Sequence, residues 1–210
     1  MSVNMDIQLL TNILETDPKF SHDVDDVIAE IAPVIVECIN EELGTTYTVE
    51  SYIESLSAGK MFLGMSFDEL LRYYEKAWVN KTDTIQKKVE PSELSAFLRV
   101  NEGKVDLVTS RDEKTLPALE DWLSINYPEN KFNIICTSGG DKSALDYKIY
   151  IDDAVRLAQS IANREDKFMF LVDVPNNRNF QDLKNVVRVS GAAEAYKIIE
   201  DAKTLSRVKT

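Results

Sequence analysis

Residues 147–174 read YKIYIDDAVRLAQSIANREDKFMFLVDV, and this stretch decides the fold. An apolar run that ends in two acids (147–153) is followed by a helical pattern (154–164) and by a second apolar run (168–174). A strand, a helix and a strand of these lengths predict two parallel strands joined by a crossover helix. Ligands of such sheets gather beyond the carboxyl ends of the strands, which is where Asp152 and Asp153 stand.

The same alternation continues on both sides of this stretch. Further strands are predicted from short apolar runs at 104–110 (KVDLVTS), 132–138 (FNIICTS) and 186–189 (VVRV). Further helices are predicted at 116–127 and 192–202. The expected fold is therefore α/β, with a Rossmann-like parallel sheet covered by helices on both faces.

The first half of the chain has a different, mainly helical pattern. A short amphipathic helix is predicted before Asp17-Pro18, and a longer one over residues 27–43 that ends at Gly44. Residues 45–90 have the pattern of an all-helical insertion, in which Ser66 and Glu69 form a capping box. Another helix is predicted to start at Pro91.

Composition limits the classes of function. With 210 residues, 44% of them hydrophobic and 29% charged, the chain can form one ordinary domain with a modest insertion. A net charge of -12 argues against a nucleic-acid polymer or an anionic membrane as partner. No apolar stretch of membrane-spanning length and no signal-peptide pattern is present, so a cytoplasmic location is expected. Cys38 and Cys136 lie in apolar segments and are expected to be reduced.

Four motifs are expected to meet at the carboxyl edge of the sheet. Residues 20–30 (FSHDVDDVIAE) hold a group of acids, KVDLVTS ends in two hydroxyls, SGGDKS (138–143) holds a lysine, and YKIYIDD ends in two acids. The candidate residues are Asp23, Asp25, Thr109, Ser110, Lys142, Asp152 and Asp153.

This set is what phosphate-ester hydrolysis requires. Carboxylates that crowd together need a cation, and hard oxygen ligands with open positions favour Mg²⁺. One aspartate can attack phosphorus while a second protonates the leaving oxygen, and a lysine and a hydroxyl can neutralise the phosphoryl oxygens. Two alternatives for the first acids are a helix N-terminus and a calcium loop; the apolar residues 27–29 argue against the calcium loop.

The order DVDDVIA, VTS, DKS and IDD, with a helical insertion between the first two, resembles the haloacid dehalogenase (HAD) superfamily of phosphohydrolases. Within it, the pattern is most similar to the 5'(3')-deoxyribonucleotidase-like branch. The resemblance implies a core of residues 19–30 and 91–210, a helical cap of residues 31–90 and an N-terminal extension of residues 1–18. It further implies a phosphomonoesterase that acts on a small phosphorylated substrate, most plausibly a nucleoside monophosphate, and a homodimer.

By position, the resemblance assigns a role to each motif residue. Asp23 is expected to be the nucleophile and a metal ligand, and Asp25 the general acid and base, with its backbone carbonyl on the metal. Thr109 and Ser110 are expected to bind phosphate together with Lys142. Asp152 and Asp153 are expected to complete a Mg²⁺ site. Arg111, Tyr74 and Trp78 are candidate substrate contacts, and Phe62 and Tyr73 are further aromatics that could stack on a base, although aromatics of an amphipathic helix more often lie in the core.

Three positions depart from the family pattern. Asp26 replaces a glycine, although aspartate tolerates unusual backbone angles better than most residues. The residues before Asp23 (KFSH) lack the apolar run of a strand, and Ala154 stands where the mammalian-type deoxyribonucleotidases carry an arginine. Two alternatives therefore remain open: a phosphatase of a sugar phosphate or other small metabolite, and a HAD-like protein that binds without catalysis. His22, the only histidine, is expected to pack away from the site.

Overall fold

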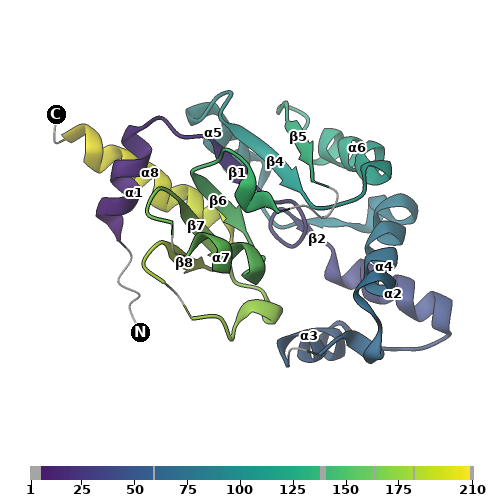
Figure 1. Ribbon diagram of the computed structural model, residues 1–210. Helices are drawn as coiled ribbons and strands as arrows, with labels where there is room; N and C mark the ends of the chain where they lie inside the picture. The colour runs from purple at the N-terminus through teal and green to yellow at the C-terminus, as the bar shows by residue number, and fades with distance from the viewer. Residues whose placement is uncertain (1–5, 59, 138–140, 163, 182, 209–210) are drawn as a thin grey trace.

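The computed structural model describes residues 6–58, 60–137, 141–162, 164–181 and 183–208. Its centre is a six-stranded sheet in the order β5-β4-β1-β6-β7-β8, and every pair of neighbours is parallel (Figure 1). The strands are β1 (Phe20–His22), β4 (Val105–Thr109), β5 (Asn133–Cys136), β6 (Ile149–Asp152), β7 (Phe168–Val172) and β8 (Val186–Val189). The α/β fold class with a parallel sheet is confirmed.

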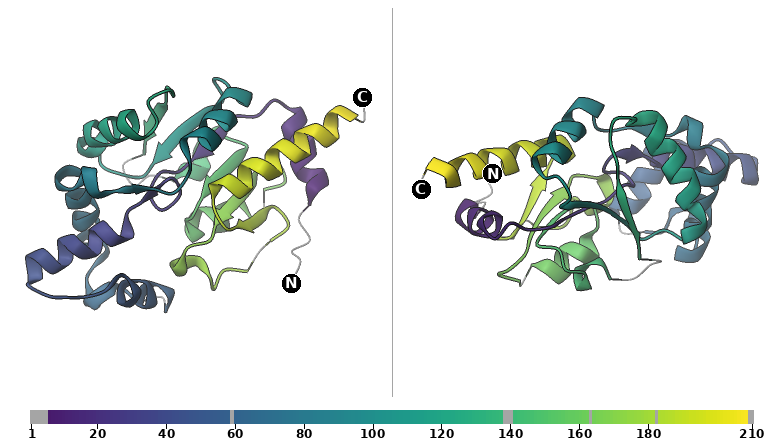
Figure 2. Two further views of the ribbon diagram at one scale, coloured as in Figure 1. Left: turned by 180° about the vertical axis from the view of Figure 1, so that it is seen from behind. Right: turned by 90° about the horizontal axis from the view of Figure 1, so that it is seen from above.

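Helices cover both faces of this sheet. Helices α1 (Ile7–Glu15), α5 (Pro91–Val100) and α8 (Ala192–Val208) lie on one face, and α7 (Val155–Ile161) lies on the other (Figure 2). Alternate strand residues follow the same division: Phe168 and Phe170 join the apolar cluster of the first face, whereas Met169 and Leu171 join that of α7. The predicted N-terminal helix is α1, and it packs against α8.

Strand β1 occupies the centre of the sheet although its sequence is a poor strand pattern. It pairs with β4 on one side and β6 on the other, and Phe20, Ser21 and His22 are all buried. His22 meets polar partners with both ring nitrogens, so its burial leaves neither nitrogen unpaired. The central strand can thus hold a buried histidine because Tyr196 of α8 and the backbone of Asp23 bind its ring nitrogens.

The helix predicted over residues 27–43 begins later than expected. Helix α2 spans Ala32–Leu43, with Pro33 in its first turn and Gly44 as a left-handed C-terminal cap. Residues 24–29 form a tight turn in which the amides of Ile28 and Ala29 donate to the carbonyl of Val24. A strand, β2 (Ala29–Glu30), follows and pairs with β3 (Gln86–Lys87) in a two-stranded antiparallel sheet. The expected start was wrong because Val27, Ile28 and Ala29 are buried in this turn, and β2 follows it before the helix begins.

The segment between β2 and β3 is otherwise helical. It contains α2, α3 (Val49–Ser57), α4 (Phe67–Asn80) and short 3₁₀ turns at Phe62–Gly64 and Thr82–Thr84. Helix α4 begins at the predicted capping box of Ser66 and Glu69. These helices lie to one side of the large sheet, next to α6 (Leu116–Asn126) (Figure 1). Across the described residues, every helix is too short or too polar to cross a membrane.

Candidate active site

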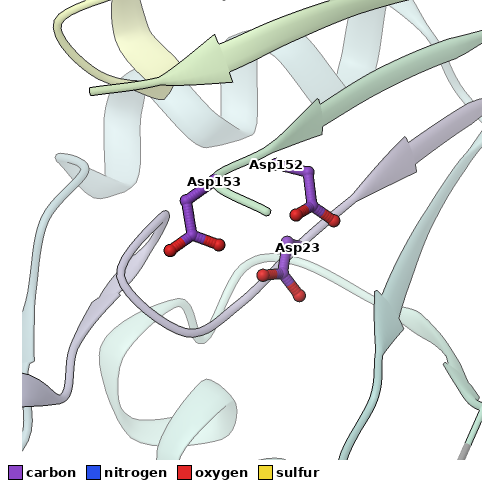
Figure 3. Close-up of side chains that lie close together, drawn as sticks. All are labelled: Asp23, Asp152 and Asp153. Atoms are coloured by element: carbon purple, nitrogen blue, oxygen red, sulfur yellow. The ribbon is translucent and has the colours of Figure 1, made fainter. Parts of the chain in front are cut away.

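The predicted acids meet at the carboxyl ends of adjacent strands. Asp23 directly follows β1, Asp152 ends β6, and Asp153 comes next in the chain. One carboxylate oxygen of each of the three lies within 4.8 Å of the others, and their side chains converge on one space (Figure 3). Thr109 ends β4, the other neighbour of β1, and is buried at the same edge.

Lys142 completes this group from a different direction. Its Nζ donates to Asp23 Oδ1 and to Asp152 Oδ2, each at 2.7 Å, and the side chain is only 7% exposed. Lys142 begins a 3₁₀ turn, Lys142–Ala144, that is capped by the side chain of Asp141. Of the motif SGGDKS that predicted this lysine, residues 138–140 lie outside the described part of the chain.

The charges of this group do not balance. Three carboxylates face one ammonium, and two of the carboxylates, Asp23 and Asp152, are buried, whereas Asp153 is half-buried. Burial raises the pKa of Asp23 to about 7, with the Lys142 ammonium acting against that rise. Burial and the charges of Asp23 and Asp152 raise the pKa of Asp153 well above its usual range. A divalent cation would remove this strain, and three carboxylate oxygens are the ligand type that Mg²⁺ prefers.

Asn177 binds the backbone of Asp153, a role that the sequence analysis did not predict. Its buried side-chain amide donates to the carbonyl oxygens of Asp153, at 2.9 Å, and Val172, at 2.7 Å. Arg188 donates to the Asn177 side-chain oxygen at 2.5 Å. The stretch VPNNR (174–178) around Asn177 is thus the support of the second acid of IDD.

Asp25 is not part of the group of three acids and pairs with Arg111 instead. Arg111 Nε donates to Asp25 Oδ2 at 2.6 Å, and Arg111 Nη2 donates to Asp25 Oδ1. Trp78 Nε1 donates to the same Oδ1 at 2.9 Å. The Arg111 guanidinium also stacks on Trp78, with Cζ 3.8 Å from the centroid of the ring. The backbone amide of Arg111 donates to Thr109 Oγ1 at 3.3 Å, which joins this pair to the phosphate-binding candidate.

Asp26 occupies the left-handed conformation that the family glycine would adopt. Its φ is 55°, its backbone amide donates to the carbonyl of Ala29, and its Oδ1 accepts from the amide of Ile31 at 3.3 Å. Burial, followed by the charge of Asp25, raises the pKa of Asp26 to about 6. Aspartate is therefore accommodated at this position by local hydrogen bonds.

The aromatic side chains do not form a platform for a base. Trp78 is 0% exposed and is covered by Arg111, and Phe62 and Tyr73 are buried in the core. Base stacking by Trp78 does not fit this structure, because its ring offers no open face to a substrate. Tyr74 is partly buried against the core, and Ser110 is exposed beyond the end of β4.

His22 lies behind the site, on the face of β1 covered by α5 and α8, as expected. Its ring tilts against Phe97 and Tyr196, and it contacts the backbone of Asp23 instead of the carboxylates. Cys38 and Cys136 form no disulfide within the described residues, and Cys136 Sγ lies 2.6 Å from the carbonyl oxygen of Arg111.

Comparison with known proteins gives the fold. No protein-family model and no curated protein matches this sequence. Solved structures do match, and they include hydrolases and phosphatases of the HAD superfamily. One is a predicted phosphatase from Clostridium acetobutylicum, with 15% identity, a TM-score of 0.56 and coverage of 88% of this chain and 99% of the other.

Two more matches extend this range. A β-phosphoglucomutase from Clostridium difficile shares 17% identity over 91% of this chain and 99% of its own, with a TM-score of 0.50. A HAD-type protein from Bacillus subtilis, bound to magnesium, shares 14% identity over 86% of this chain and 97% of its own, with a TM-score of 0.50. At these identities the likeness is one of fold, and it confirms a HAD-like arrangement of strands and helices.

Proposed function

We propose that this protein is a Mg²⁺-dependent phosphomonoesterase that acts through a phospho-aspartate at Asp23. The observation that carries the proposal is the unbalanced charge: three converging carboxylates face a single lysine at the carboxyl edge of a parallel sheet. A phosphoryl group and a divalent cation together fit that place. The metal would be held by Asp23, Asp152 and Asp153, with the backbone carbonyl of Asp25 as a further candidate ligand.

Asp23 and Asp25 can carry out both steps of the proposed reaction. A carboxylate oxygen of Asp23 attacks phosphorus, the bond from phosphorus to the ester oxygen breaks, and Asp25 gives that oxygen a proton. Asp25 then takes a proton from a water molecule that attacks phosphorus, and inorganic phosphate leaves Asp23. Lys142 and Thr109 donate hydrogen bonds to the phosphoryl oxygens as charge shifts. When bound, Mg²⁺ supplies further positive charge to the same oxygens.

We further propose that residues 31–90 act as a cap over the core formed by residues 19–30 and 91–210. The support is structural: the insertion leaves the core at β2, returns at β3, and supplies Trp78 to the environment of Asp25. Asp23, Thr109, Lys142 and Asp152 are all nearly inaccessible here. A substrate therefore requires the cap to move.

The structure favours a substrate without a base over a nucleoside monophosphate. A nucleoside monophosphate keeps a place in the test panel, but burial of Phe62, Tyr73 and Trp78 removes the aromatic surface that was expected to receive a base. A small phosphorylated metabolite without a base fits better. β-Phosphoglucomutase among the similar structures is consistent with that class.

The experiment measures phosphate release from nucleoside monophosphates and small sugar and acid phosphates, with Mg²⁺ and with EDTA. Wild type, Asp23→Asn and the exposed control Asp83→Asn are compared side by side. We expect magnesium-dependent turnover in wild type and control, and a loss of at least about 10³-fold in Asp23→Asn, because the nucleophile is removed. A folded Asp23→Asn protein that is as active as wild type would contradict the mechanism. No turnover on any ester, with Mg²⁺ still bound, would favour a binding role.

A further inference from the structure

The side chain of Arg111 is buried yet only partly used. Its Nε and Nη2 bind Asp25, its plane lies over Trp78, and it is 7% exposed. Its third nitrogen, Nη1, is buried and has no hydrogen-bond partner among the described residues. A buried guanidinium nitrogen without an acceptor is costly, and a carboxylate or phosphate oxygen is the acceptor that it binds best.

Both carboxylate oxygens of Asp25 already accept hydrogen bonds. Oδ1 accepts hydrogen bonds from Arg111 and Trp78, and Oδ2 accepts from Arg111. The general acid of the proposed reaction must place one of these oxygens against the leaving oxygen of the ester. In this arrangement Arg111 binds both carboxylate oxygens, so some event has to separate the pair.

We propose that this event is the binding of a second oxyanion of the substrate, and that Arg111 is the residue that selects for it. The substrate class is then a small phosphate monoester that carries a carboxylate or a second phosphate. That oxyanion binds Nη1 together with Nη2, so the bond from Nη2 to Asp25 breaks and Asp25 is released toward the ester oxygen. The inference rests on the proposed phosphatase function and names its substrate class.

Geometry supports the placement. Arg111 lies two residues after Thr109, and its backbone amide donates a hydrogen bond to Thr109 Oγ1. The Arg111 side chain therefore leaves the backbone beside the proposed phosphoryl position. Its planar fork suits two parallel hydrogen bonds to one oxyanion. Trp78 supports that plane from one side, and this leaves the guanidinium fixed in orientation when Asp25 departs.

The test uses two esters that differ only in the second anion, 3-phosphoglycerate and glycerol 3-phosphate. Wild type, Arg111→Gln, Arg111→Lys and the exposed cap control Arg72→Gln are assayed with Mg²⁺. We expect wild type and the control to prefer 3-phosphoglycerate by about tenfold or more in kcat/KM. Arg111→Gln should lose about tenfold on 3-phosphoglycerate and gain several-fold on glycerol 3-phosphate, because Asp25 is no longer held. Arg111→Lys should keep part of the preference, since it keeps the charge but not the fork.

If Arg111 had only a structural role, Arg111→Gln would not change kcat/KM in opposite directions on the two esters. Equal losses on both esters in Arg111→Gln, or no preference in wild type, would overturn the inference. If no variant releases phosphate, the proposed function fails separately, and calorimetric binding of both esters to the Mg²⁺-loaded protein decides this inference. Tighter binding of 3-phosphoglycerate that is lost in Arg111→Gln supports it, and equal binding of both esters refutes it.

Discussion

At the scale of single residues, His22 shows how a buried titratable group can support the site without joining it. Its Nδ1 lies 2.7 Å from the backbone oxygen of Asp23, which can only accept, so Nδ1 carries the proton. Its Nε2 lies 2.6 Å from the Tyr196 hydroxyl and therefore accepts. The neutral imidazole thus fixes the backbone of the proposed nucleophile through α8.

This arrangement makes stability depend on pH. Burial lowers the pKa of His22 from 6.5 to about 4, so the unfolded chain takes up the proton first as the pH falls. The contribution to stability is complete above pH 6.5 and is lost between pH 6.5 and pH 4, by about 3 kcal/mol in all. Urea unfolding in EDTA should show a steeper fall over this range for wild type than for His22→Gln. Parallel curves for the two proteins would contradict the prediction.

At the scale of elements, the 3₁₀ turn that carries Lys142 is held by a second buried lysine. Lys167 Nζ donates to the carbonyls of Ser143 and Leu145, both at 3.0 Å, and to the Tyr150 hydroxyl at 2.6 Å. Lys167 stands directly before β7, so one strand positions the lysine that serves its neighbour β6.

Lys167→Met should therefore affect both stability and catalysis. Two buried carbonyls lose their donor, which should lower the free energy of unfolding by about 2 kcal/mol. Displacement of Lys142 should lower phosphate release by about tenfold. Lys148→Met is the matched control, because Lys148 forms an exposed pair with Asp166 and should change stability by less than about 1 kcal/mol. If the Lys167→Met protein is destabilised but releases phosphate at the wild-type rate, Lys167 does not position Lys142 for catalysis.

The elements also show which features a sequence can predict. The capping box of α4, the Pro91 start of α5 and the acids that end β6 depend on residues close in the chain, and they were found. Strand β1 has only a poor strand pattern, because its place in the sheet depends on pairing with distant strands on both sides. The start of α2 was predicted too early, because the apolar residues of the turn at 24–29 look like the first turn of a helix. Asp25 and Arg111 are 86 positions apart in the chain, so no local sequence pattern predicts that they pair.

At the scale of the whole molecule, the insertion contacts the core beside the support of the proposed metal site. Helix α3 contacts the 3₁₀ turn Pro175–Asn177, whose last residue holds the backbone of Asp153. On the other side, Trp78 of α4 binds Asp25. The position of the insertion is therefore linked to two acids of the site, one through a core loop and one directly.

This linkage leads to a prediction about metal binding and global stability. Mg²⁺ that binds the folded chain and not the unfolded chain should stabilise it by about 2.7 kcal/mol at a concentration 100 times Kd. Wild type and Asp83→Asn should show that increase in thermal unfolding, and EDTA should abolish it. Asp153→Asn removes one of the three converging carboxylates, so it should lose most of the increase while being at least as stable as wild type in EDTA, because one buried negative charge is gone. An equal Mg²⁺ effect in Asp153→Asn would place the metal elsewhere in the molecule.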